Sequence, residues 1–69
     1  MDKNKIENED ILFFANGEIV VYSLNQRWIL DMFYNDNLEC IGNPNLNIVK
    51  IIRQNDQVIY TNEQNITRV

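Results

Sequence analysis

The sequence predicts a small all-β domain, either an SH3-like barrel or a strongly curved antiparallel sheet of about four to five strands. Three observations predict it. Short runs of β-branched and aromatic residues recur along the 69-residue chain, turn-forming residues separate two pairs of these runs, and the first pair is apolar on both faces. An OB-like barrel, or a flatter sheet completed by dimerisation, fits the same observations.

Residues 1–9 are predicted to be a flexible N-terminal tail ahead of a single small β domain over residues 10–69. The tail alternates charged and amide side chains, and Ile6 is its only apolar residue after Met1. Burying one side chain does not offset the entropy lost by ordering so many residues.

Residues 11–24 contain the strongest local signal, two β-prone runs joined by Asn16-Gly17. Asn and Gly tolerate the positive φ angles of a two-residue type I′ turn, so a β-hairpin is predicted. Such a turn pairs Phe13 with Val20. Because both faces of this hairpin are apolar, each must be covered by the remaining strands, by a second protomer or by a ligand.

The middle of the chain is predicted as a short strand over Arg27–Leu30 that leads into a turn. Residues 34–44 have the Asn, Asp, Gly and Pro content of a loop. Leu38 and Ile41 are expected to anchor this loop on the core.

The second half of the chain predicts a second hairpin. Residues 46–53 are dense in β-branched side chains and form a central buried strand, with Ile48 and Ile52 on one side and Val49 and Ile51 on the other. Residues 58–61 form the next strand, and the turn between them lies near Asn55-Asp56. Residues 62–69 are either an edge strand or a tail.

The composition excludes several classes of chemistry. The chain has one cysteine and no histidine, so it has no intramolecular disulfide, no ordinary structural zinc site and no imidazole to activate Cys40. A domain of this size usually needs an additional source of stability, and self-association is the one that remains. A homo-oligomer is therefore expected. We predict a protein that is not an enzyme and that has no cofactor and no metal.

Charge and hydropathy also limit the partners. The net charge is -4 and the six basic residues are scattered, which argues against duplex nucleic acid. No apolar run is long enough to span a bilayer. With its lone thiol and no secretory signal, the chain is expected in the cytoplasm of a bacterial cell.

Acidic residues and glycines do not form a recognisable site. Asp31, Asp36 and Glu39 lack the spacing of a calcium loop and are interpreted as solvated turn carboxylates. Gly17 and Gly42 lie in no phosphate-binding loop.

Three segments resemble a family of short phage and prophage proteins, mostly of unknown function. These are Tyr34–Leu38, Leu46–Ile51 and Val58–Tyr60, similar to a Tyr-Asn-Asp-Asp-Leu loop, an Asp-Ile-Val-Lys-Val strand and a final Ile-Trp-Glu-Arg strand. The chain departs from this pattern at Asn37 and Asn47, which replace Asp, at Tyr60, which replaces Trp, and at Thr61-Asn62. The resemblance implies a phage origin and no particular activity.

The loop that carries the resemblance has two interpretations. In the first, Asn35 and Asp36 bond their own backbone to hold a turn, with Tyr34 and Leu38 packed down. In the second, the loop and Trp28 form a recognition surface.

The leading functional hypothesis is a phage-encoded, non-catalytic binding protein that counters host defence. In its first form a homo-oligomer sequesters a small nucleotide signal. Cations would meet the phosphates and aromatic rings would stack on the bases, and the predicted ligand-binding residues are Arg27, Trp28, Tyr34, Asn35, Lys50 and Arg53. In its second form the chain is a stoichiometric inhibitor of a host defence protein such as a nuclease. A virion component or an SH3-like adaptor is the remaining alternative.

Overall fold

The computed structural model describes residues 2–62 and contains one antiparallel four-stranded sheet and one short helix. In chain order the elements are β1 (Ile11–Phe14), β2 (Ile19–Val21), α1 (Arg27–Phe33), β3 (Ile48–Arg53) and β4 (Gln57–Thr61). Single 3-10 turns lie at Lys3–Lys5, Leu24–Gln26, Pro44–Leu46 and Gln54–Asp56. The predicted antiparallel, mostly β architecture is confirmed at this level.

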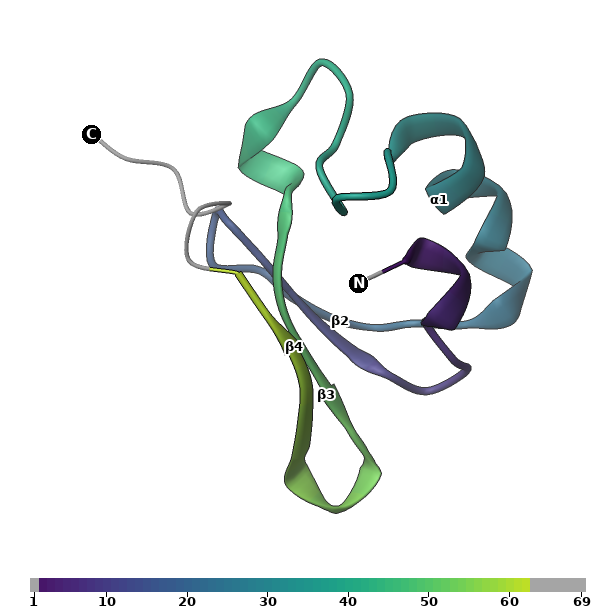
Figure 1. The fold of residues 1–69 in the computed structure, drawn as a ribbon, viewed down its shortest axis with the longest axis vertical. Helices are drawn as coiled ribbons and strands as arrows, with labels where there is room; N and C mark the ends of the chain where they lie inside the picture. Colours follow the sequence, from purple (N-terminus) through teal and green to yellow (C-terminus); the bar gives the residue numbers. More distant parts are fainter. Residues whose placement is uncertain (1, 63–69) are drawn as a thin grey trace.

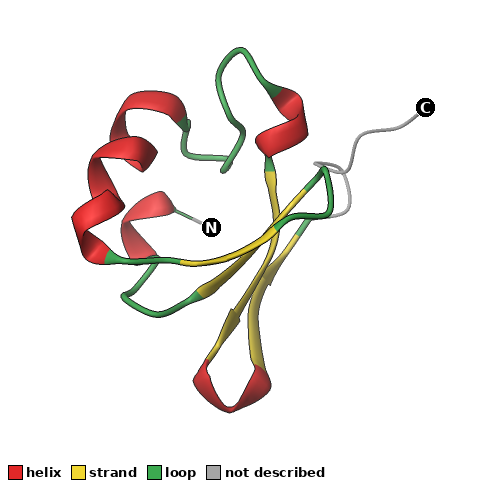
Figure 2. Ribbon diagram, turned by 180° about the vertical axis from the view of Figure 1, so that it is seen from behind, coloured by secondary structure: helices red, strands yellow, loops and turns green. Residues whose placement is uncertain are grey.

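The sheet is open rather than closed into a barrel. Its strand order is β2-β1-β3-β4, so β2 and β4 are the edges of the part that the structure describes. Figures 1 and 2 show α1 and the loops gathered at one end of the strands, while the β3–β4 hairpin projects from the other end. No helix within residues 2–62 is long and apolar enough to cross a membrane.

The first hairpin is confirmed, but its predicted turn and register are wrong. The Gly17 N–H donates to the Phe14 carbonyl and the Phe14 N–H donates to the Glu18 carbonyl, each at 2.9 Å. The loop therefore has three residues, with Gly17 at a φ of 92°, the geometry of a type I turn followed by a bulge. Phe13 consequently pairs with Ile19 instead of Val20.

Arg27–Phe33 forms a helix, so the strand predicted for Arg27–Leu30 is wrong. A short apolar run is compatible with either structure, and tertiary contacts decide it. Leu30 is the one buried side chain of α1. The Lys3 Nζ donates to the carbonyls of Leu30 and Tyr34 at 3.4 and 2.9 Å, which satisfies acceptors at the helix C-terminus.

The second hairpin is confirmed, with its turn where Asn55 and Asp56 take φ angles of 73° and 61°. The predicted alternation along β3 is wrong. The β1–β3 register shifts between Phe13 and Phe14, and this irregularity lets Ile48 and Ile51 both be fully buried. The prediction for residues 62–69 falls almost wholly outside the described residues.

The N-terminal segment, for which the sequence predicts a flexible tail, packs against the domain. Ile6 is only 3% exposed and belongs to the core. Asp10 is also buried and accepts hydrogen bonds from Arg53 and from the Glu7 N–H. The packing of Ile6 in the core and the contact of Asp10 with Arg53 join residues distant in the sequence, so no local pattern in residues 1–9 reveals them.

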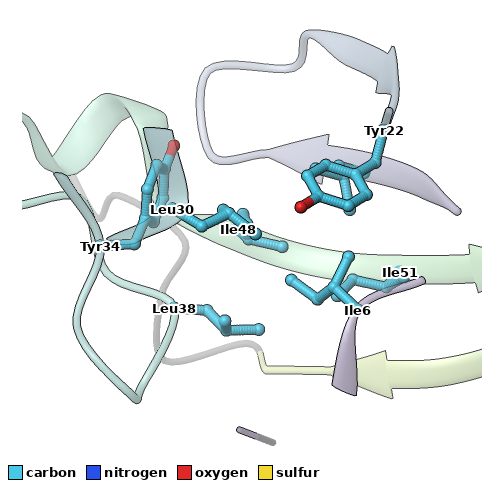
Figure 3. Close-up of a cluster of buried hydrophobic side chains, with 8 residues drawn as sticks. Ile6, Tyr22, Leu30, Tyr34, Leu38, Ile48 and Ile51 are labelled. Carbon is cyan, nitrogen blue, oxygen red and sulfur yellow. The ribbon is translucent and has the colours of Figure 1, made fainter. Parts of the chain in front are cut away.

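The core lies between one face of the sheet and the cover formed by α1, the N-terminal segment and the 34–47 loop. Figure 3 shows its side chains converging from these elements; the buried apolar residues are Ile6, Leu12, Tyr22, Leu30, Tyr34, Leu38, Ile48 and Ile51. Leu38 anchors the loop as predicted, with no exposed surface, but Ile41 is 65% exposed and does not.

Candidate functional site

The face of the sheet opposite this core carries two cross-strand ladders of side chains. Directly paired residues point to the same side of a sheet. The first ladder is aliphatic on every strand and consists of Val21, Ile11, Ile52 and Val58. The second runs beside it and consists of Ile19, Phe13, Lys50 and Thr61. We call these residues the outer face.

The outer face is apolar and open. Ile19 and Val21 are each 60% exposed and Val58 is 50% exposed, so residues 2–62 do not cover the edges of this surface. Four strands about 4.8 Å apart and two ladders about 7 Å apart span roughly 250 Å². The largest apolar patch on a typical monomer is about 300–600 Å² and often functional, so the outer face lies just below that range.

Lys50 supplies the single charge in these ladders. Its Nζ lies 5.4 Å from the centre of the Phe13 ring, a cation–π contact that holds the ammonium over the apolar surface. The ladders contain no carboxylate, although the whole chain has a net charge of -4. The ladders of the outer face therefore carry one positive charge and no negative charge, whereas the whole chain has a net negative charge.

The other two predicted cations lie elsewhere and are engaged in ion pairs. Arg27 on α1 donates to Asp31 at 3.2 Å and also contacts Asn4. Arg53 donates to Asp10 from two nitrogens at 3.0 Å and lies 2.9 Å from a Glu7 carboxylate oxygen. These hydrogen bonds raise the pKa of Arg53. Lys50 is therefore separated from Arg27 and Arg53 by the sheet.

Arg27 and Arg53 approach the same N-terminal turn from different elements. Arg27 contacts Asn4, and Arg53 donates to the carbonyl of Lys5 at 3.1 Å. An open hollow of about 550 Å³ is lined there by Asn4, Lys5, Glu7, Arg53 and Ile59. Two cations, Lys5 and Arg53, and one carboxylate, Glu7, line this hollow, and its lining has no aromatic ring.

The predicted aromatic residues occupy contrasting environments. Trp28 is 55% exposed on α1 and meets Phe33 edge to face, with ring centroids 6.4 Å apart. Tyr34 is buried, and its hydroxyl donates to the Leu46 carbonyl. Burial raises the pKa of Tyr34 above its ordinary value of 10.0, and Cys40 adds to this effect. Tyr34 is therefore placed to hold the loop to the core rather than to stack on a ligand.

Asn35 acts locally on its own loop. Its Oδ1 accepts from the Asn37 N–H at 2.9 Å and from the Glu39 N–H at 3.1 Å. Its Nδ2 donates to Glu39 at 3.0 Å. This is the turn-forming interpretation of the loop, in which the amide replaces missing backbone partners.

Within residues 2–62, no three His, Cys, Asp or Glu side chains gather in a way that could hold a metal ion. No family model matches the chain, and neither do curated proteins or solved structures.

Sequence reasoning identified only half of the outer face. The two apolar faces of the first hairpin indicate that each needs a cover, and Lys50 is predicted only as a cation that meets phosphates. Ile52 and Val58 were missed because irregularities in the β1–β3 and β3–β4 registers decide which side chains share a face.

Proposed function

We propose that the chain is a non-catalytic protein-binding module that engages a partner protein through its outer face. The observation that supports this proposal is the aliphatic ladder that crosses all four strands with exposed residues at both edges. The largest apolar patch on a monomer is often functional, and this ladder is part of the outer face.

The chemistry of the face defines the partner surface. It fits a flat apolar surface that carries a carboxylate opposite Lys50. Burying roughly 250 Å² at about 25 cal/mol per Å² contributes about 6 kcal/mol, which lies near the lower end of the cost of association. The backbone edges of β2 and β4, or a polar rim, must therefore add to the contact.

The resemblance to short phage proteins supports the biological side of this proposal. A small stoichiometric binder encoded by a phage would act on a host protein, and we propose a component of host defence as its target. An adaptor in the virion would use the same face.

Sequestration of a nucleotide stays a prediction with less support. The hollow beside Lys5 and Arg53 has room for such a ligand. However, Asp10 and Glu7 already engage Arg53, and Trp28, Tyr34 and Lys50 do not line that hollow.

The test compares three forms of the protein as bait in a bacterial lysate after measuring their mass in solution by light scattering. They are the wild type, an Ile19→Thr/Val58→Thr double variant that disrupts the outer face, and Met32→Thr as a matched control. Met32 is 64% exposed on α1 and lies outside the two ladders.

We expect the wild type and Met32→Thr to retain the same partner protein and the double variant to lose it at least tenfold. A partner held equally by all three would contradict the proposal, as would a monomer that retains no partner. A wild-type dimer that dissociates in the double variant would identify a second copy as the occupant of the face.

A further inference from the structure

A second site candidate lies on the inner side of the sheet, between β2 and α1. It is a cavity of about 160 Å³ with a largely apolar wall. Its floor is formed by the buried side chains of Leu12, Leu30 and Ile48, and the more exposed Val20 and Gln26 stand at its mouth. It is therefore reachable from solvent while most of its wall belongs to the core.

The cavity wall includes a buried hydroxyl whose O–H has no acceptor within residues 2–62. Tyr22 is only 3% exposed and lines the cavity, yet within residues 2–62 its hydroxyl oxygen has no partner at full hydrogen-bond geometry. In Figure 3 the oxygen end of its ring is directed toward Ile48 and Leu30. Burying a hydroxyl without a partner is unfavourable, so such groups are rare and call for an explanation.

Neighbouring polar groups do not satisfy this hydroxyl in the structure. The charge of Arg27 and a side-chain hydrogen bond from it both oppose the rise that burial causes in the pKa of Tyr22. A guanidinium can only donate, so this contact gives the Tyr22 O–H no acceptor, and the same guanidinium also bonds to Asp31 and Asn4. The Tyr34 hydroxyl, also on the cavity wall, donates to Leu46.

We propose that this cavity binds a small neutral ring compound whose one polar group hydrogen-bonds to the Tyr22 hydroxyl. An apolar protein cavity of about 150 Å³ accommodates benzene, so the ligand has roughly six to eight non-hydrogen atoms. The site is separate from the outer face and does not depend on the function proposed for that face.

The test uses phenol and benzene as probes in amide chemical-shift titrations of the whole chain. Both should give saturable shifts centred on Val20, Gln26 and Ile29. Phenol should bind roughly fivefold more tightly than benzene because only phenol can satisfy Tyr22. In Tyr22→Phe this preference should disappear while benzene binding remains.

Two variants of adjacent residues provide a matched pair that does not depend on Tyr22. Val20→Phe should fill the cavity and abolish binding of both probes. Val21 projects from the opposite face of the same strand, so Val21→Phe should leave the binding of both probes unchanged. The proposal is overturned if neither probe gives saturable shifts, if Val20→Phe binds like the wild type, or if phenol keeps its advantage in Tyr22→Phe.

Discussion

Single isoleucines in this chain have opposite roles that their sequence context does not reveal. Ile6 lies in a polar N-terminal segment but is 3% exposed and packs in the core. Ile41 is predicted to anchor its loop on the core, yet its side chain is 65% exposed. The difference is one of tertiary contact rather than of residue type.

Ile6→Ala should lower the free energy of unfolding by about 3 kcal/mol, because it removes buried methyl groups and leaves a cavity. Ile41→Ala is the control and should change it by less than about 0.5 kcal/mol. Urea denaturation followed by circular dichroism measures both. Equal effects of the two substitutions would show that residues 2–9 do not pack as the structure has them.

At the scale of elements, turns and bulges determine which side chains meet. The three-residue loop at Ala15–Gly17 shifts the first hairpin by one residue relative to a two-residue turn. Because side chains alternate along a strand, this shift changes every pair across the hairpin. The loop is therefore responsible for placing Phe13 and Ile19 together on the outer face.

Gly17→Ala should destabilise the hairpin by about 1 kcal/mol, since Gly17 has a φ of 92° that residues with a Cβ rarely adopt. A Cβ there would meet no atom within 4 Å, so the cost is purely conformational. Gly17→Asn should cost less, because Asn tolerates this region better. Thermal unfolding of both variants provides the measurement, and an Ala variant as stable as the wild type would exclude this turn geometry.

At the scale of the whole molecule, the core includes two tyrosines whose pKa values are both raised mainly by burial, Tyr22 and Tyr34. Above pH 10 the unfolded chain releases tyrosine protons that the folded chain retains. The unfolded state then binds fewer protons, so stability is fully present below pH 10 and falls as the pH rises above it.

We expect the free energy of unfolding to decrease as the pH rises above 10 and the slope to become shallower in Tyr34→Phe. Denaturant unfolding at a series of pH values, together with tyrosinate absorbance, tests this expectation. A slope that Tyr34→Phe leaves unchanged would mean that Tyr34 titrates normally in the fold.

The two faces of the sheet account for the organisation of the molecule. One face packs against α1, the N-terminal segment and the 34–47 loop, while the other remains largely apolar and uncovered by residues 2–62. For a domain with so little core, this open face supports the proposal that the chain acts by contact with another molecule.

The sequence by itself determined the β-rich class, the two hairpins and the apolar character of both faces of the first hairpin. These follow from local propensity and from turn residues such as Asn16-Gly17 and Asn55-Asp56, whose effect is short-range. The same reasoning predicts the anchoring of Leu38 and includes the turn-forming role of Asn35 as one of two interpretations of its loop.

Only the tertiary structure decided the helix at Arg27–Phe33, the burial of Ile6 and the membership of the outer face. Each depends on a contact between residues far apart in sequence, such as Lys3 with the end of α1 or Arg53 with Asp10. Strand registers likewise depend on bulges that a period-two pattern does not encode. Local patterns therefore specify the elements, whereas packing determines which of their side chains remain available for binding.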